Sequence, residues 1–170
     1  MRGYVQEDIE RIVQRIDRSN KPRFELCDTG SNVKIRGLQG HSLKGIDDRC
    51  TFETLCTDDI NLPTCCVHGT YKKYFHNIMR NGLIPGGSRG STFRNHVHFY
   101  RSQSLEDAGN LPLKYGIGIW IDLPRAIRDG VTFYDNMNQT ILSRGDAGCI
   151  SSRYFIRVQD LHNRQILYSR

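Results

Sequence analysis

Apolar side chains recur at helical spacing in two stretches of this chain. In residues 7–16 three isoleucines and a valine form one stripe, and Glu7 and Asp8 occupy the first turn, where the helix dipole favours acidic groups. In residues 71–81 aromatic and aliphatic side chains share one face, while lysines, a histidine and an arginine lie elsewhere. Gly82 and the Pro-Gly-Gly run behind it predict the end of this second helix.

Runs of alternating or uniformly apolar residues predict the strands. Such runs occupy residues 23–27, 32–37, 65–67, 96–99 and 117–122. The first two flank an Asp-Thr-Gly-Ser turn, which is typical of a hairpin, and the last is apolar enough to be buried on both faces. A short helix is predicted after it, at 124–129. We expect one central mixed sheet with the helix at 71–81 packed on it, and deep burial of Val67, Ile78 and Ile119.

Polar residues interrupt this pattern beside two of the predicted strands. His68, Gly69 and Thr70 follow the strand at 65–67 and read as a turn, in which Thr70 can cap the next helix and Gly69 lets a ligand approach the backbone. His96 and His98 lie two residues apart, so they share one face of their strand. From the residues alone, the three histidines either meet an arginine in one cleft or belong to a strand end and a solvated face.

The composition narrows the class of protein only modestly. A chain of 170 residues with a net charge of +6 suits one domain, or one and a fraction, and favours a polyanionic partner. No apolar run approaches the roughly 20 residues of a membrane span, and the first ten residues do not read as a signal peptide. We therefore expect an intracellular protein, cytoplasmic or nuclear, that does not bind membranes.

The six cysteines do not have the density of a disulfide scaffold. A zinc site could be imagined from four of them and a histidine, namely Cys50, Cys56, Cys65, Cys66 and His68. Their spacing is irregular, and adjacent residues in a strand point to opposite faces. We therefore expect thiols and no metal.

A second polar motif follows the predicted hairpin. Arg36, Gln39, His41 and Ser42 offer a planar bidentate donor, neutral donors and a hydroxyl, a set suited to a phosphate dianion. Alone, the segment is equally consistent with a polar loop. The next stretch, residues 45–63, reads as a connector with little chemistry.

These two motifs, in this order, resemble those of the RNA 2'-phosphotransferase family, the tRNA-splicing 2'-phosphotransferases with bacterial KptA included. Residues 35–42 are similar to the family's Ile-Arg-Ala-x-Gln-Gly-His-Ser motif, and HGTYKKYFHNIMRNGL followed by RNHVHF is similar to its nicotinamide-nucleotide half. The segment from His68 also resembles the His-Gly-Ser helix of poly(ADP-ribose) polymerases. In that register Gln139 falls near the glutamate that guides transfer, although an edge-of-pocket residue is the simpler interpretation.

The resemblance implies an α+β fold in two parts. Residues 1–44 would be the remnant of a winged-helix lobe, reduced to a helix and a hairpin and ending in the Gln-Gly-His-Ser segment. Residues 45–170 would form an NAD-binding domain of the ADP-ribosyltransferase type, with a mixed sheet and flanking helices. The family resemblance covers nearly the whole chain.

The resemblance also implies a reaction and a set of site residues. An RNA 2'-phosphate would be ADP-ribosylated by NAD, the co-substrate, and then released as ADP-ribose 1'',2''-cyclic phosphate. The partner would be 2'-phosphorylated RNA of the tRNA type, the protein a monomer, and no metal is implied. Arg36 and Lys114 would be catalytic, with Arg36, Gln39, His41 and Ser42 on the RNA phosphate. The implied NAD-binding residues are His68, Gly69, Thr70, Tyr71, Arg94, His96 and His98.

The sequence departs from the family on the phosphate side. The family's amino-terminal Arg-His pair has no counterpart, and we expect that the chain begins inside that lobe. The place of a further arginine holds Pro112, with Lys114 the nearest cation. Two alternatives therefore stay open: an ADP-ribosyltransferase acting on a nucleic-acid end or a protein, and a non-catalytic module that binds NAD or RNA.

Overall fold

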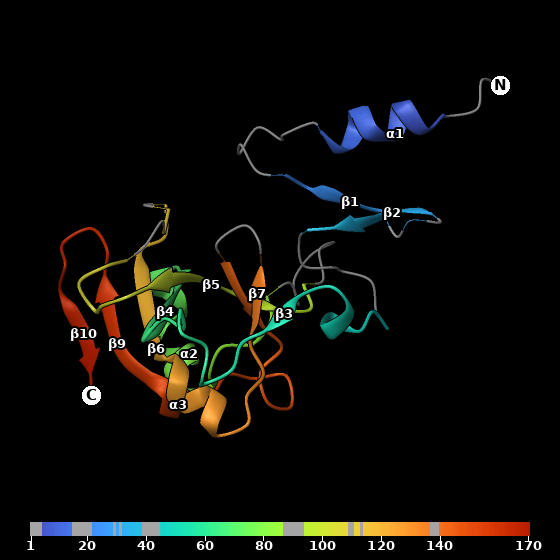
Figure 1. The fold of residues 1–170 in the computed structure, drawn as a ribbon. Helices are drawn as coiled ribbons and strands as arrows, with labels where there is room; N and C mark the ends of the chain where they lie inside the picture. Colours follow the sequence, from blue (N-terminus) through green and yellow to red (C-terminus); the bar gives the residue numbers. More distant parts are fainter. Residues whose placement is uncertain are drawn as a thin grey trace.

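A computed structural model describes residues 5–14, 22–28, 30, 32–38, 45–86, 94–108, 111–112, 114–136 and 140–170 (Figure 1). Its centre is an eight-stranded sheet in the order β10-β9-β6-β4-β5-β8-β7-β3. The strands are β3 Glu53–Thr54, β4 Cys65–Thr70, β5 Val97–Ser102, β6 Ile117–Asp122, β7 Tyr134–Asn136, β8 Thr140–Ser143, β9 Phe155–Asp160 and β10 Ile166–Ser169. Together with the helices this confirms the α+β class.

The prediction of a mixed sheet was wrong, because each described pairing in this sheet is antiparallel. The chain between β4 and β5 leaves and re-enters at the same end of the sheet. Cys65 pairs with Ser102 and Val67 with Tyr100, so β5 begins beside the end of β4 and runs back along it. Strand direction follows from such connections, and the apolar pattern of each strand carries no information about it.

The predicted helices are confirmed, with changes at their ends. The stretch from Tyr71 begins with a 3-10 turn, η2 (Lys72–Tyr74), and becomes α-helical in α2 (Phe75–Asn81). Gly82 ends α2 with a φ of 77°, a conformation that favours glycine. The other helical elements are α1 Gln6–Val13, α3 Leu123–Arg128, and the 3-10 turns η1 Asp48–Cys50 and η3 Ser152–Tyr154. Residue 16, the last of the first predicted helix, lies outside the described residues.

The two faces of the sheet bury different clusters. One face carries Cys66, Phe99 and Ile119, and α2 and α3 contribute Ile78, Leu123 and Ala126 to the same core. On the other face Val67 and Trp120 pack with the loop residue Leu111. Val67 and Ile119 are fully buried and Ile78 is nearly so, as predicted. β4 therefore lies in the middle of the core.

Strand β4 is longer than predicted and separates from β5 at its end. The prediction of a polar turn at 68–70 was wrong, because His68, Gly69 and Thr70 continue the strand and pair with β6. Polar residues are tolerated in a strand whose backbone hydrogen bonds are made. In the described register, however, β4 pairs with β5 only through Cys65–Val67. Beyond Val67 the two strands diverge, and the backbone groups on the β5 side of residues 68–70 have no strand partner in this register.

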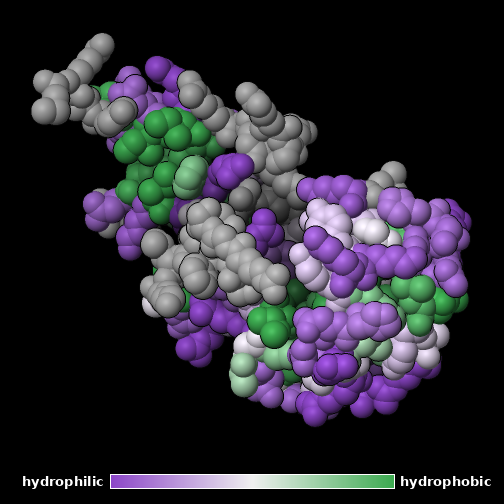
Figure 2. Space-filling model, turned by 180° about the vertical axis from the view of Figure 1, so that it is seen from behind, coloured by the Kyte–Doolittle hydropathy of each residue, from purple (hydrophilic) through white to green (hydrophobic). Residues whose placement is uncertain are grey.

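The N-terminal elements form a separate small unit. Strands β1 (Phe24–Asp28) and β2 (Val33–Gly37) make the predicted hairpin as a two-stranded sheet, and α1 lies over it with no buried residue. Figure 2 shows an apolar patch on this unit. Its exposed apolar side chains are Val5, Ile9, Ile12, Phe24, Val33 and Ile35. The assignment of residues 1–44 to a winged-helix remnant stays a prediction.

The described α-helices are six to eight residues long. Within the described ranges, none is both long enough and apolar enough to cross a bilayer.

Candidate functional site

A cavity of about 810 Å³ opens where β4 and β5 diverge. Its wall combines the ends of both strands with α2 and the loop after Gly82. The predicted residues that line it are His68, Gly69, Thr70, Arg94, His96 and His98. A volume of this size is typical of a small-molecule site. The structure therefore brings most of the predicted NAD-binding set together, here called the histidine cavity.

His68 takes part in closing the gap between the strands. Its Nδ1 lies 2.8 Å from the backbone carbonyl oxygen of His98, and its ring packs edge-on against Phe99. A carbonyl oxygen only accepts, so Nδ1 carries the proton and Nε2 keeps its lone pair. Burial lowers the pKa of His68, and the hydrogen bond to His98 opposes that shift only in part. The ring is therefore neutral at physiological pH.

His98 is neutral for a similar reason. Burial, together with the nearby charge of Arg94 and the imidazoles of His96 and His68, lowers its pKa from 6.5 to about 4. Strand alternation places the His68 side chain on the α2 face and the His98 side chain on the opposite face. The two imidazoles still line one cavity, because β4 and β5 diverge at this point.

Gly69 serves packing inside the protein. A Cβ built on this residue would lie 2.4 Å from Cδ2 of Tyr115 and 2.5 Å from Cδ1 of Leu111. The glycine therefore lets Tyr115 close over the strand beside the cavity. Thr70 is buried and paired with Ile117, and the N-cap of η2 is Tyr71, without a side-chain hydrogen bond, so the prediction that Thr70 caps the helix was wrong.

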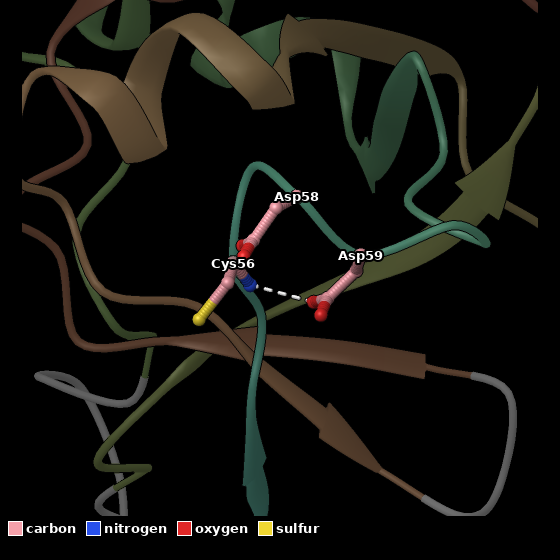
Figure 3. A group of neighbouring side chains, drawn as sticks. All are labelled: Cys56, Asp58 and Asp59. Atoms are coloured by element: carbon pink, nitrogen blue, oxygen red, sulfur yellow. Dashed lines mark hydrogen bonds between the residues drawn. The ribbon is translucent and has the colours of Figure 1, made fainter.

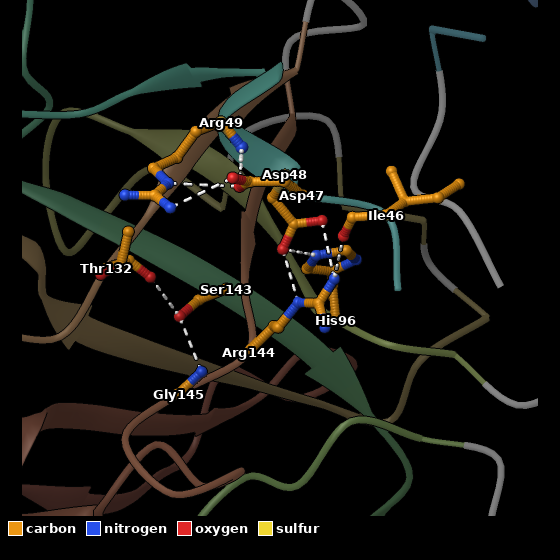
Figure 4. Close-up of polar contacts among 9 residues, drawn as sticks. All are labelled: Ile46, Asp47, Asp48, Arg49, His96, Thr132, Ser143, Arg144 and Gly145. Atoms are coloured by element: carbon orange, nitrogen blue, oxygen red, sulfur yellow. Dashed lines mark hydrogen bonds and ion pairs between the residues drawn. The ribbon is translucent and has the colours of Figure 1, made fainter. Parts of the chain in front are cut away.

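His96 is held by a buried carboxylate. Its Nε2 lies 2.8 Å from Oδ2 of Asp48, and both side chains are almost fully buried. Arg144 donates to the same carboxylate from Nε at 2.5 Å and from a terminal nitrogen at 2.9 Å (Figure 4). Burial alone raises the pKa of Asp48, but the hydrogen bonds from Arg144 and His96 outweigh it and hold this pKa below its usual range. Asp48 is therefore an ionised anchor for His96.

Asp48 and Arg144 were missed by the sequence analysis. Asp48 belongs to the stretch that we interpreted as a connector, and it is 48 residues from His96 and 96 from Arg144. Neither spacing follows a helix or strand period. The one local signal is that Asp47 caps η1 through the backbone N–H of Arg49, which marks a short turn and says nothing of a partner.

Arg36 lies at a second cavity. Its side chain pairs with Glu25 across the hairpin at 2.6 Å and lines a space of about 350 Å³, here called the arginine cavity, together with Arg49, Phe52 and Asp135. The two cavities are linked by η1, because Asp48 holds His96 while Arg49 and Cys50 line the arginine cavity. Gln39, His41 and Ser42 lie outside the described residues.

The remaining predicted residues lie near the mouth of the histidine cavity. Tyr71 is 47% exposed and is not among the described lining residues, but its ring contacts Tyr74 and Tyr115, which are. Lys114 is exposed, with Nζ 5.4 Å from the ring centre of Tyr115. Arg94 is exposed on the cavity wall. Gln139 lies outside the described residues.

The described residues include one group with metal-ligand character, Cys56, Asp58 and Asp59 (Figure 3). All three are exposed, and Asp59 accepts a hydrogen bond from the backbone N–H of Cys56 at 2.6 Å. The carboxylate thus stabilises its own turn. The residues once imagined as a zinc set are dispersed: Cys65 donates to Ser102, and Cys66 is buried on the opposite face.

Comparison with known proteins adds independent information. The model of a family described as RNA 2'-phosphotransferase, Tpt1 / KptA family, matches residues 2–145. The tRNA 2'-phosphotransferase 1 of Danio rerio is 31% identical over 167 residues, which cover 94% of this chain and 68% of that protein. The Homo sapiens protein of the same name is 32% identical, covering 91% of this chain and 58% of its own length. A probable RNA 2'-phosphotransferase of Pseudomonas fluorescens is 32% identical over 139 residues, 81% of this chain and 65% of that protein.

Proposed function

This chain belongs to the RNA 2'-phosphotransferase, Tpt1 / KptA family, and we propose that it removes an internal 2'-phosphate from RNA with NAD as co-substrate. The names of its eukaryotic relatives favour tRNA as the RNA. Because the chain spans 58% of the human protein and 68% of the zebrafish protein, the activity of those whole proteins is carried over here as a proposal.

The proposed reaction has two steps. An oxygen of the RNA 2'-phosphate forms a bond to the anomeric carbon of the nicotinamide ribose while the bond to nicotinamide breaks. The ribose 2''-hydroxyl then loses its proton and attacks the phosphorus, and the RNA 2'-oxygen leaves and is protonated. The products are nicotinamide, RNA with a free 2'-hydroxyl, and ADP-ribose 1'',2''-cyclic phosphate.

The gathering of His68, Gly69, Thr70 and His98 at one cavity is the observation that carries this proposal, and the lowered pKa of the two histidines is consistent with it. Departure of nicotinamide leaves positive charge on the ribose, and a charged imidazole nearby would oppose it, whereas a neutral one donates or accepts hydrogen bonds without that cost. The unpaired β5 side of β4 beyond Val67 offers backbone N–H and C=O groups that suit the acceptor and donor of a carboxamide. Arg94, on the same wall, suits the pyrophosphate.

The cations assigned to the RNA phosphate lie on the outer side of this site. Lys114 stands over Tyr115 at the cavity mouth, and Arg36 lines the arginine cavity beyond η1. Both would neutralise the phosphate during its attack on the ribose and again during its release. Gln39, His41 and Ser42 complete this set in the proposal on the ground of the sequence motif.

One observation favours a second candidate. Arg36 is paired with Glu25 and lines a cavity other than that of His68, so the phosphate-binding cation and the nucleotide site are separate here. A chain in which they stay apart would transfer ADP-ribose to a nucleic-acid end or a protein and would not complete the second step. If neither step took place, the chain would be a non-catalytic module that binds NAD or RNA.

A single assay distinguishes these functions. The protein is incubated with NAD and a 2'-phosphorylated oligonucleotide, and the ADP-ribosylated intermediate, the dephosphorylated RNA and nicotinamide are each followed over time. Conversion to dephosphorylated RNA supports the leading proposal. Accumulation of the intermediate supports the second candidate.

The matched variants use two histidines of the same region. His68→Ala should abolish nicotinamide release and ADP-ribose binding measured by calorimetry. His76→Ala, on the exposed side of α2 and outside the described lining residues, should leave both unchanged. If His68→Ala binds ADP-ribose like the wild type, the histidine cavity is not the nucleotide site.

A further inference from the structure

We propose that Tyr71, Tyr74 and Tyr115, here called the tyrosine cluster, form a stacking platform for bases of the RNA strand beside its 2'-phosphate. This inference rests on the proposed function, because it takes RNA as the ligand of the histidine cavity's outer rim. It adds a base-binding surface to a site for which only nucleotide and phosphate contacts have been proposed.

The three rings come from two segments that the sheet brings together. Tyr71 and Tyr74 follow β4 on either end of η2, and Tyr115 precedes β6, the strand paired with β4. The Tyr71 ring centre lies 6.4 Å from that of Tyr74 and 5.9 Å from that of Tyr115, both in edge-to-face geometry. Tyr71 is 47% and Tyr74 44% exposed. Large aromatic surface is thus held open to solvent in a fixed arrangement.

The arrangement is fixed from below by Gly69. Without a side chain there, the Tyr115 ring packs directly on β4, and Tyr71 packs against the edge of Tyr115. Tyr74 and Tyr115 line the histidine cavity, while Tyr71 is outside its described lining. The cluster therefore extends from the wall of the cavity to an exposed ring outside its described lining.

Positive charge accompanies the rings. Lys73 Nζ lies 5.0 Å from the Tyr74 ring centre, and Lys114 Nζ lies 5.4 Å from that of Tyr115. An apolar protein partner would gain little from cations over the rings that it must cover. A single strand of RNA presents bases and phosphates alternately, and sites for such strands combine aromatic faces with basic side chains. The charge complementarity thus selects RNA as the occupant.

The test is fluorescence anisotropy with a labelled single-stranded oligoribonucleotide, with and without an internal 2'-phosphate. Base stacking is worth roughly 1–3 kcal/mol per base, so Tyr71→Ala should weaken binding of both oligonucleotides by about 5- to 150-fold. Tyr71→Phe, which keeps the ring, should bind within about twofold of the wild type. Tyr74→Ala provides an independent second truncation, and thermal melting establishes that each variant is folded.

Two variants that each remove one positive charge provide the charge control. Lys73→Ala should weaken RNA binding and reduce its salt dependence, while binding ADP-ribose like the wild type. Arg128→Ala removes the same charge from the end of α3 and should leave RNA affinity unchanged. Tyr115 precedes the first residue of β6, whereas α3 follows the last, so Arg128 and Tyr115 are at opposite ends of this strand.

Several outcomes would overturn the assignment. The first is an unchanged RNA affinity in both Tyr71→Ala and Tyr74→Ala. The second is an equal loss of RNA affinity in Tyr71→Phe, which would implicate the hydroxyl. The third is an equal loss of ADP-ribose affinity in Tyr71→Ala, which would place the ring in the nucleotide site. The proposed function fails separately, through an absence of NAD turnover. A wild type that turns over NAD but binds unphosphorylated RNA no better than Tyr71→Ala does would refute the platform alone.

Discussion

The histidine cavity and the arginine cavity contain ionisable side chains in opposite states. In the first, His68 and His98 are half-buried, and burial lowers the pKa of both, so they are neutral. In the second, Arg36 and Arg49 form ion pairs with Glu25 and Asp47 at 2.6 and 3.1 Å near the surface. The difference is one of solvent access rather than of residue type. In the proposed reaction, the neutral imidazoles suit the sugar and the charged arginines suit the phosphate.

Asp48 marks the boundary between the two cavities, and removing it should have the largest effect. Breaking a buried ion pair commonly costs on the order of 4 kcal/mol, because the remaining partners lose their counter-charge. Asp48→Ala should therefore lower the free energy of unfolding by about that amount, measured by urea titration. Asp47→Ala, one residue away but exposed, is the matched control and should cost much less. Equal losses in the two variants would mean that η1 matters only as a turn.

The neutrality of His98 should make stability depend on pH. Its pKa is about 4 in the folded chain against 6.5 as the ordinary value, so between these pH values the unfolded chain binds the extra proton. The free energy of unfolding should then fall as pH drops from 6.5 to 4, by about 3 kcal/mol from this group. His98→Asn should flatten the profile, whereas His76→Asn should retain it. A profile unaffected by His98→Asn would show that this imidazole is not kept neutral by the fold.

Gly69 should tolerate a methyl group poorly, with a smaller effect. The added Cβ would need the space of Tyr115 and Leu111, and overpacking of this kind costs about 2 kcal/mol. Gly69→Ala should lower the melting temperature and, by displacing Tyr115, weaken RNA binding as well. Gly86→Ala, where a Cβ meets open space, is the control for the melting temperature. Unchanged RNA affinity in a destabilised Gly69→Ala would separate packing from the tyrosine cluster.

The smallest effect is expected at the charged pair of the hairpin. Arg36 and Glu25 side chains are 41% and 34% exposed, and pairs of this kind contribute below about 1 kcal/mol. Glu25→Gln should leave stability nearly unchanged while it favours contacts of Arg36 with a phosphate. It should therefore tighten binding of the 2'-phosphorylated oligonucleotide relative to the unphosphorylated one, by anisotropy. Equal tightening of both would assign Arg36 to the RNA backbone in general.

Local patterns were sufficient for the elements and insufficient for their partners. The hairpin, α2 with its glycine end, and the buried strand β6 follow from spacing within a few residues, and each was predicted. The extension of β4 through His68–Thr70 was not predicted, because polar residues at the end of a strand are also typical of a turn. Only the neighbouring strand distinguishes the two. The antiparallel direction of the sheet likewise depends on where connections return.

The site was predictable to the extent that its residues form contiguous motifs. His68, Gly69 and Thr70, with His96 and His98, were selected by the resemblance of their motifs to those of the family, and the structure places them at one cavity. Asp48 and Arg144 have no such signal, since their only common feature is a contact made across the folded chain. Tyr71 was grouped with the nucleotide by its position in the motif, although its ring lies at the mouth.

The divergence of β4 from β5 has a consequence for hydrogen exchange. Cys65–Val67 are bonded on both sides, within the part of the sheet that opens only when the whole domain unfolds. Beyond Val67, amides that face β5 lack a strand partner, although their neighbours along the same strand are still bonded to β6. One continuous strand should therefore contain both slowly and rapidly exchanging amides. Slower exchange of only the rapidly exchanging amides, on addition of a ligand, would show at single residues that the ligand had bound between β4 and β5.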